Sequence, residues 1–184
     1  MCGGAGSRLD ATVEKPLYPV AGTPMIERVL DALAASRTDQ VFAVTSPATP
    51  ETAATLECPC IETPGDGYVA DLGRALADER VSEPALTVAA DLPLLDGDAI
   101  DAVLDAADGA LTVALPVGRK RALGLSVDTA FRHGGRLVTP AGVNVVGEGG
   151  DTLLTRNLRF GANVNRPSDA RRAEWLLAGG RFFI

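Results

Sequence analysis

The sequence predicts an α/β protein with a mainly parallel sheet and helices on both of its faces. Two observations carry this prediction: apolar, β-rich runs recur along the chain, and amphipathic segments with helical spacing alternate with them. Continuous apolar runs are typical of strands that are buried on both faces, as in parallel sheets. A length of 184 residues with 46% hydrophobic residues fits one domain with a sizeable core, and no linker divides residues 1–184.

The predicted elements follow one another in order along the chain. Strands are expected at residues 41–45, 85–90, 110–115 and 142–146, and helices at residues 24–33, 68–76, 99–107 and 168–177. Thr23 is expected to cap the first helix with Pro24 as its first residue, and Pro167 is expected to open the last. Asp96 is interpreted as the cap of the helix that follows it, because aspartate is a preferred N-cap residue.

The composition restricts the partners that the chain can have. Its 24 acidic and 17 basic residues give a net charge of −7, which disfavours nucleic acid as a partner. An acidic, lysine-poor surface is typical of proteins that work in strong salt, with an ordinary acidic cytosolic protein as the alternative. No apolar run approaches the roughly 20 residues of a membrane span, and no leader is evident. We therefore expect a cytoplasmic protein without a membrane span.

A glycine-rich run near the start is the first candidate site: Gly3-Gly4-Ala5-Gly6-Ser7-Arg8-Leu9. Closely spaced glycines let backbone N–H groups approach an anion, and basic residues beside them supply countercharge, so the run predicts a phosphate-binding loop. It fits neither the Walker loop nor the dinucleotide fingerprint. On the run alone, a flexible tail is an equal alternative. Lysine occurs only at positions 15 and 120, so the retention of Lys15 beside the loop favours an ammonium that contacts phosphate.

The segment before these glycines is unusually short for an α/β fold. Ligands in such sheets bind beyond the carboxyl ends of the strands, so a strand is expected to lead into the loop. Only Met1 and Cys2 precede the glycines, so the first strand is missing from the sequence as given. A sheet without its central strand would leave neighbouring edges unpaired. We therefore expect the natural chain to start upstream.

Asp91 is the second candidate site residue, because it directly follows the apolar run at residues 85–90. A carboxylate at a strand's carboxyl end, beside a phosphate loop, is suited to hold Mg²⁺ against nucleotide phosphates. A capping or turn aspartate is the alternative. Asn163 and Asn165 lie on the same side of an extended segment, which could place one amide near the metal, although local backbone bonding explains them equally well. The single histidine and the Cys58-Pro59-Cys60 spacing make a zinc site improbable.

The motifs together resemble a family of nucleotidyltransferases that includes the molybdenum-cofactor (MobA-like) guanylyltransferases and the sugar-nucleotide pyrophosphorylases. The resemblance rests on four segments: residues 3–9, 14–17, 90–92 and 163–165. Three more segments resemble the archaeal adenosylcobinamide-phosphate guanylyltransferases in particular: residues 45–50, 67–72 and 140–146. The resemblance implies a single Rossmann-like three-layer sandwich of the nucleotide-diphospho-sugar transferase type, over nearly the whole chain except its first strand.

The resemblance also implies an activity and its residues. GTP and adenosylcobinamide phosphate would yield adenosylcobinamide-GDP and pyrophosphate, with Mg²⁺ as the expected cofactor. Arg8, Lys15 and Asp91 would be catalytic, and Asp91 and Asn165 would hold the metal. Asp71, Gly142 and Asn144 would bind the second substrate or the nucleoside. The nucleotide would be bound by the following residues: Gly3, Gly4, Ala5, Gly6, Ser7, Arg8, Lys15, Ser46 and Asp91.

Other functions stay open at this point. The acceptor could be molybdopterin or a sugar phosphate, which the motifs do not decide. The chain could instead be a GTP-binding module without turnover, or a structural protein whose motifs are accidental. A phosphate monoester acceptor has a second pKa of about 6 and is already largely ionised. Nucleotidyl transfer therefore needs no strong general base, which suits a chain with one histidine. The oligomeric state, a homodimer included, is not indicated.

Overall fold

The computed structural model describes residues 1–3, 9 and 12–180. The helices and short 3₁₀ segments are η1 (Lys15–Leu17), α1 (Met25–Ala34), α2 (Pro50–Thr55), α3 (Tyr68–Leu76), α4 (Gly97–Ala106), α5 (Val117–Ala122), η2 (Leu158–Phe160) and α6 (Pro167–Leu177). The strands are β1 (Pro19–Val20), β2 (Thr23–Pro24), β3 (Ala43–Thr45), β4 (Cys60–Glu62), β5 (Ala85–Val88), β6 (Leu111–Pro116), β7 (Phe131–His133), β8 (Arg136–Val146) and β9 (Asp151–Leu154).

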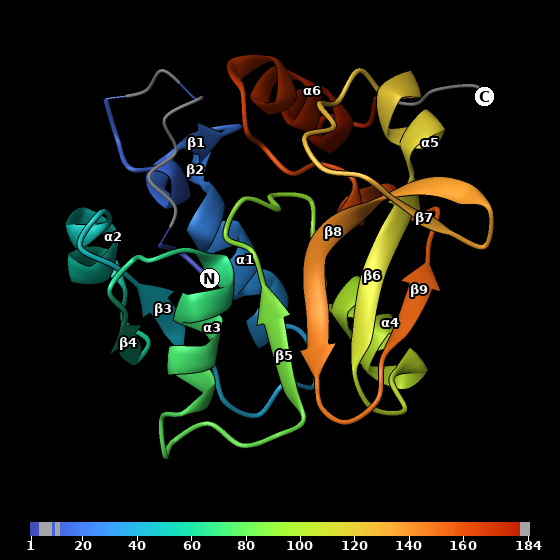
Figure 1. Cartoon of the computed structure of the whole chain (residues 1–184). Coiled ribbons are helices and arrows are strands. Elements are labelled where there is room, and N and C mark those ends of the chain that lie inside the picture. Colours follow the sequence, from blue (N-terminus) through green and yellow to red (C-terminus); the bar gives the residue numbers. More distant parts are fainter. Residues whose placement is uncertain (4–8, 10–11, 181–184) are drawn as a thin grey trace.

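The strands and helices confirm the α/β class and its mainly parallel strand direction. β3 and β4 pair in parallel. In the five-stranded sheet the order is β5-β8-β6-β9, with β7 beside β8. β5 and β6 both pair antiparallel with β8, so they share one direction, and β9 joins β6 in parallel. Helix α3 lies on the near side of the strands in Figure 1, and α1 and α4 lie on the far side. The three layers are therefore helix, sheet and helix.

The strand β8 runs against its neighbours because a tight hairpin reverses the chain before it. His133 of β7 pairs with Arg136 of β8, which leaves Gly134 and Gly135 as a two-residue loop. Both glycines have positive φ, at 53° and 75°. Positive φ at both central residues is what a two-residue β-hairpin turn of type I′ requires.

The first residues lie between β3 and β5, where Figure 1 marks the N-terminus. The ammonium of Met1 donates to the Val88 carbonyl at 2.9 Å, and Ala90 N donates to the Met1 carbonyl at 3.2 Å. On the other side Cys2 N donates to the Val44 carbonyl at 2.8 Å. In a parallel pair of strands, one residue hydrogen-bonds through its N–H and its carbonyl to two residues of the neighbouring strand that are two positions apart. Met1 does this with Val88 and Ala90. Met1 and Cys2 thus take the central position in the sheet and direct Gly3 toward the carboxyl ends of the strands.

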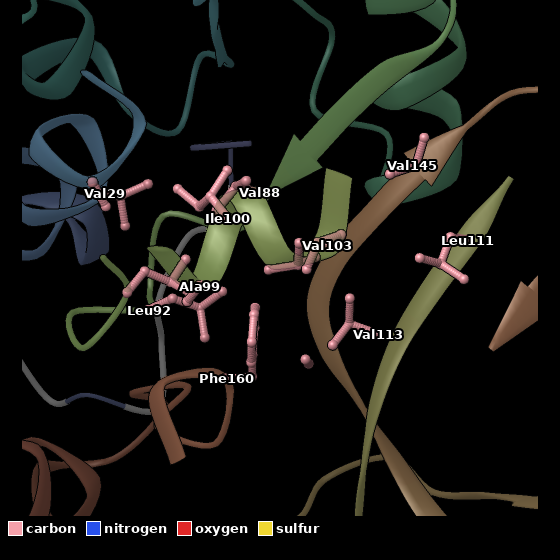
Figure 2. Close-up of a cluster of buried hydrophobic side chains, with 14 of the residues drawn as sticks. Val29, Val88, Leu92, Ala99, Ile100, Val103, Leu111, Val113, Val145 and Phe160 are labelled. Atoms are coloured by element: carbon pink, nitrogen blue, oxygen red, sulfur yellow. The ribbon is translucent and has the colours of Figure 1, made fainter. Parts of the chain in front are cut away.

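A large apolar cluster packs the far side of the sheet against α1 and α4. Figure 2 shows side chains of this cluster, including Val29 of α1, Ile100 and Val103 of α4, and Val113 and Val145 of the sheet. Along β8, alternate residues from Ala141 to Val145 are buried in it, while those between them are only half-buried. Because side chains alternate across a strand, the residues between them face the other side of the sheet. Gly142 and Asn144 therefore share the face that this cluster leaves uncovered.

The helix ends test three predictions from the sequence. Asp96 caps α4, with its carboxylate accepting from Ala99 N at 3.0 Å, and Pro167 opens α6, both as expected. The expected start of α1 is wrong by one residue. Pro24 occupies the cap position, Thr23 makes no side-chain cap, and the two residues pair with β1 instead. Thr23 thus lies one residue before the cap position, because β2 extends through Pro24 and the helix begins at Met25.

A cavity of about 400 Å³ lies between β3 and β5. Its lining is largely apolar, and none of the described site residues predicted from the sequence contributes to it. The predicted site residues Ser46 and Asp91 lie instead just after the carboxyl ends of β3 and β5. Within the residues that the structure describes, no helix is both long and apolar enough to cross a bilayer.

Candidate active site

A close ion pair between Lys15 and Asp91 forms the centre of the candidate site. Asp91 follows β5 by three residues, and its carbonyl accepts from Val164 N at 2.9 Å. Lys15 opens η1 and its Nζ lies 2.6 Å from Asp91 Oδ2. The two side chains remain 18% and 14% exposed, so they are accessible to a ligand. The structure thus brings together two predicted residues that are 76 positions apart in sequence.

Two asparagines from one extended segment complete this centre. Lys15 Nζ also donates to Asn165 Oδ1 at 2.7 Å. Asn163 Nδ2 donates to the Ala141 carbonyl at 2.9 Å and lies 3.4 Å from Asp91 Oδ1. The expectation that both asparagines lie on the same side of their segment is confirmed, because both amides reach the Lys15–Asp91 pair.

Lys120 is a member of this network that sequence reasoning missed. Its side chain comes from α5, is 3% exposed, and donates from Nζ to Asn163 Oδ1 at 2.9 Å. Burial lowers the pKa of the Lys120 ammonium, and the nearby carboxylates of Asp91, Asp169 and Asp128 oppose that effect. The signal that could have found it was the scarcity of lysine, which the sequence analysis used only for Lys15.

A second polar cluster surrounds Gly3, at the start of the glycine-rich run. Ser46, directly after β3, donates from Oγ to the Gly3 carbonyl at 3.1 Å. Asp71 of α3 is buried and accepts from Gly65 N at 3.0 Å. A Cβ added to Gly3 would lie 3.3 Å from Ser46 Cβ and 3.8 Å from an Asp71 oxygen. Ser46 and Asp71 therefore fix the entry to the predicted phosphate loop.

The glycine-rich run itself falls mostly outside the described residues. Gly4, Ala5, Gly6, Ser7 and Arg8 are among those not described, so their part in binding phosphates stays a prediction. Leu9, which follows them, is 2% exposed and belongs to an apolar cluster with Val164 and Met25. The first and last residues of the run, Gly3 and Leu9, are described and are thus anchored near the site.

Glu14 fixes the segment that carries Lys15. Its carboxylate accepts from Glu51 N and Thr52 N, each at 2.7 Å, at the start of α2. Desolvation raises the pKa of Glu14, but the hydrogen bonds from Thr52 and Glu51 outweigh it and hold this pKa below its usual value. The charged form is therefore favoured, and it ties the residue before Lys15 to a helix N-terminus.

Gly142 and Asn144 occupy the uncovered face of β8 in different surroundings. Gly142 has φ +78°, and a Cβ there would lie 3.0 Å from Ala89 Cβ and 3.1 Å from Asn163 Nδ2. Asn144 Nδ2 donates to Tyr68 Oη at 3.1 Å. Asn144 is also paired with Thr87 in the register of β5 and β8. Gly142 thus adjoins the Lys15–Asp91 centre through Asn163, whereas Asn144 makes its hydrogen bonds with Tyr68 and Thr87.

We expect Gly142→Ala to disturb this centre without unfolding the protein. Alanine at φ +78° costs roughly 1–3 kcal/mol, and its methyl group would press on the Asn163 amide. Gly149→Ala is the matched control, because Gly149 has φ +79° with nothing within 4 Å of an added Cβ. Melting temperatures should fall for both variants, and further for Gly142→Ala because of its added contacts, whereas turnover should fall only for Gly142→Ala. Equal activity in the two variants would show that Gly142 does not influence the Lys15–Asp91 centre.

A fully buried carboxylate holds the asparagine segment in place. Asp169 of α6 is 0% exposed and accepts from Ser126 N and Ser126 Oγ, each at 2.8 Å. It also accepts from Asn165 N at 3.1 Å and from Arg166 N at 2.9 Å. Four donors on one carboxylate fix the backbone that presents Asn165 to Lys15.

Asp169→Ala is expected to lower the free energy of unfolding by about 3 kcal/mol, because three partly buried N–H groups and a hydroxyl lose a charged, buried acceptor. Asp105→Ala is the matched control: Asp105 is largely exposed and pairs with Arg37 on the surface, so its loss should cost about 1 kcal/mol or less. Urea denaturation measures both. Equal midpoints for the two variants would show that Asp169 does not hold this segment.

The residues present fit a hard cation. Asp91 and Asn165 offer a carboxylate and an amide oxygen, and both now bond one ammonium, that of Lys15, which lies where a bridging cation would lie. Mg²⁺ is commonly held by one or two carboxylates together with substrate phosphates. In the described part of the chain no group of three or more His, Cys, Asp or Glu side chains is placed to form a protein-only metal site. Substrate oxygens would therefore have to complete the coordination.

The fold is similar to the folds of several solved structures. A CMP:2-keto-3-deoxy-manno-octonic acid synthetase complexed with CTP superposes with a TM-score of 0.62 at 15% identity, over 95% of this chain and 96% of that one. A structure named as a glucose-1-phosphate thymidylyltransferase from Bacillus anthracis gives 0.67 at 13% identity, over 100% and 95%. A hypothetical transferase from Thermus thermophilus gives 0.58 at 25% identity, over 80% of this chain, and the match spans only 63% of that chain.

The sequence comparisons identify the family within this class. Residues 1–159 match the model of the MobA-like NTP transferase domain, so the chain belongs to this family and is a nucleotidyltransferase. The adenosylcobinamide-phosphate guanylyltransferase of Methanocaldococcus jannaschii is 29% identical over 197 residues, covering 96% of this chain and 95% of the relative. The resemblance that the motifs indicated is confirmed at the level of the family.

Proposed function

We propose that this protein transfers GMP from GTP to adenosylcobinamide phosphate, giving adenosylcobinamide-GDP and pyrophosphate. The observation that carries the proposal is the end-to-end similarity to the Methanocaldococcus jannaschii guanylyltransferase. The Lys15–Asp91–Asn165 centre supports the chemical part of the proposal, since it combines a cation and oxygen ligands at the carboxyl ends of the strands.

The proposed reaction is an in-line displacement at the α-phosphorus of GTP. An oxygen of the acceptor phosphate forms a bond to that phosphorus, the bond to the oxygen between the α and β phosphates breaks, and its electron pair leaves on pyrophosphate. The acceptor is already ionised near neutral pH, so the protein has to position the two substrates and neutralise their charge. No residue of the centre has to act as a strong base.

The described residues divide these tasks between them. Lys15 neutralises triphosphate charge with a compact ammonium, as would Arg8 from outside the described residues. Mg²⁺, when held by Asp91 and Asn165, would supply further positive charge to the phosphates. Gly3, whose carbonyl accepts from Ser46 Oγ, leads into the glycine-rich run that we propose binds the phosphates. Gly142 and Asn144 present the uncovered face of β8 to the acceptor or the nucleoside.

The proposal is tested by offering the protein a set of acceptors. GTP is incubated with adenosylcobinamide phosphate, molybdopterin or glucose 1-phosphate, with and without Mg²⁺, and pyrophosphate is measured together with the mass of the product. ATP and CTP replace GTP in parallel arms. We expect a guanylated corrinoid, formed from GTP and dependent on Mg²⁺. Pyrophosphate release with another acceptor only would reassign the substrate, and GTP binding without any release would indicate a non-catalytic module.

The same assay tests the proposed adaptation to strong salt. The net charge of −7 destabilises the compact state by self-repulsion, and salt at about 1 M shortens the Debye length to roughly 3 Å and screens it. We expect activity and thermal stability to rise between 0.1 M and about 2 M KCl. Values that are flat or falling over this range would identify an ordinary acidic protein.

A further inference from the structure

Lys120 carries a buried positive charge that no step of the proposed reaction uses. Its Nζ bonds Asn163 Oδ1 at 2.9 Å, across 43 residues of sequence, and the side chain is 3% exposed. A lysine so deeply buried is uncommon unless it is paired. It also lies in a chain that has lysine at only one other position, Lys15, in the same hydrogen-bond network.

The chemistry of the Lys120–Asn163 contact fixes the orientation of the asparagine amide. An ammonium only donates hydrogen bonds, so the end of the amide that faces Lys120 must be the oxygen. The NH₂ end then faces the Ala141 carbonyl at 2.9 Å and Asp91 Oδ1 at 3.4 Å, both of which only accept. In the flipped orientation, an oxygen would face two acceptors and an NH₂ group would face an ammonium. Lys120 thus acts together with the Ala141 carbonyl and Asp91 to exclude the flipped amide, and among the described residues it is the one donor that holds the oxygen end.

The consequence reaches the centre of the site through Asp91. With the amide fixed, Asp91 Oδ1 faces an N–H donor, and Oδ2 is left for Lys15 at 2.6 Å. The carboxylate plane is therefore set from both sides. We infer that Lys120 is a positioning residue, which orients Asp91 by locking the Asn163 amide and does not itself touch the substrates.

The charge of Lys120 explains why the position carries a lysine and not a neutral donor. Asp91, Asp169 and Asp128 all act electrostatically on Lys120 and offset part of the cost of burying it. A charged donor also forms a stronger hydrogen bond than a neutral one. Part of this inference, the effect on turnover, rests on the proposed function, whereas the orientation of the Asn163 amide does not.

A double-mutant cycle tests the inference. Partners that orient a ligand-binding residue typically contribute 10- to 100-fold to activity, and we expect Lys120→Met to lower kcat/KM by about that factor. Asn163→Ala should cause a similar loss, and the double variant should be no worse than either single one, because both break the same link. Multiplicative losses would instead show that Lys120 acts by charge at long range and would overturn the inference.

Lys120→Gln serves as the matched variant, since a glutamine amide can still donate to Asn163 Oδ1 without a charge. It should retain more activity than Lys120→Met if the donor matters. Equal losses in the two variants would indicate that the charge alone matters, against the inference. Because glutamine keeps a polar partner for Asn163, this variant also provides the comparison with wild type should the methionine variant fail to fold.

A measurement independent of turnover follows the amide itself. The two side-chain N–H signals of Asn163, assigned by their loss in Asn163→Ala, should exchange slowly with solvent in the wild type and in Lys120→Gln. In Lys120→Met they should shift and exchange faster. Unchanged signals in Lys120→Met would overturn the inference. If the wild type releases no pyrophosphate with any acceptor while the amide behaves as expected, the proposed function fails and the positioning role stands.

Discussion

Asp91→Asn is expected to lower kcat/KM for pyrophosphate release by about 10²- to 10³-fold, the range observed when a group that stabilises transition-state charge is removed. Asp91 accepts from Lys15 on one oxygen and faces the Asn163 amide on the other. An asparagine has one oxygen for these two donors, so its NH₂ group must oppose either an ammonium or another NH₂. The negative charge that would hold Mg²⁺ is lost as well.

Asp96→Asn is the matched control for this variant. Asp96 caps α4 through Ala99 N and lies five positions further along the chain. Asparagine is as good an N-cap as aspartate. The ion pair with Arg159 that is lost is exposed, so activity should not change and stability should fall by about 1 kcal/mol or less. Steady-state kinetics over a Mg²⁺ titration, with circular dichroism to verify folding, measure both variants. Wild-type kinetics for Asp91→Asn at every Mg²⁺ concentration would show that the role of Asp91 is purely structural.

Lys15→Met is expected to weaken GTP binding and to lower kcat/KM by about 10²-fold, a loss comparable to that of one preorganised stabilising donor. Lys15 Nζ is the shared donor to Asp91 and Asn165, so its removal leaves two oxygens facing each other with no cation between them. The methionine retains most of the side-chain volume, which keeps the packing around η1. The loss should therefore appear in nucleotide binding and turnover more than in stability.

Arg37→Met provides the same change of a cation to methionine far from this centre. Arg37 pairs with Asp105 and is about half exposed. A surface ion pair contributes little to stability, so this variant should bind GTP as the wild type does. Calorimetric titration with GTP compares the two. Identical GTP affinity for Lys15→Met and the wild type would show that Lys15 does not bind the nucleotide.

The regular elements could be predicted because they are encoded locally. The runs at residues 85–90 and 110–115 became β5 and β6, and the pattern at residues 68–76 became α3. The direction of a strand is not encoded in its own residues. The apolar run at residues 142–146 therefore gave no sign that β8 lies antiparallel between β5 and β6, and only Gly134 and Gly135 pointed to the hairpin that reverses it.

The site could be predicted in part, for a related reason. Asp91 at the end of a strand and Lys15 beside the glycines were identified by type and position, and they meet in the structure. Lys120 could not be placed, because its role depends on a contact with Asn163 that only the folded chain creates. The buried bonds of Asp169, which present Asn165 to Lys15, likewise join segments far apart in sequence.

The central claim is that the Lys15–Asp91 centre guanylates a corrinoid phosphate. Mass spectrometry of adenosylcobinamide phosphate after incubation with GTP and Mg²⁺, run side by side with the wild type and Asp91→Asn, tests it most directly. We predict adenosylcobinamide-GDP from the wild type at a rate at least about 10²-fold above that of the variant. The absence of this product from the wild type in low and high salt, or equal rates for both proteins, would contradict the claim.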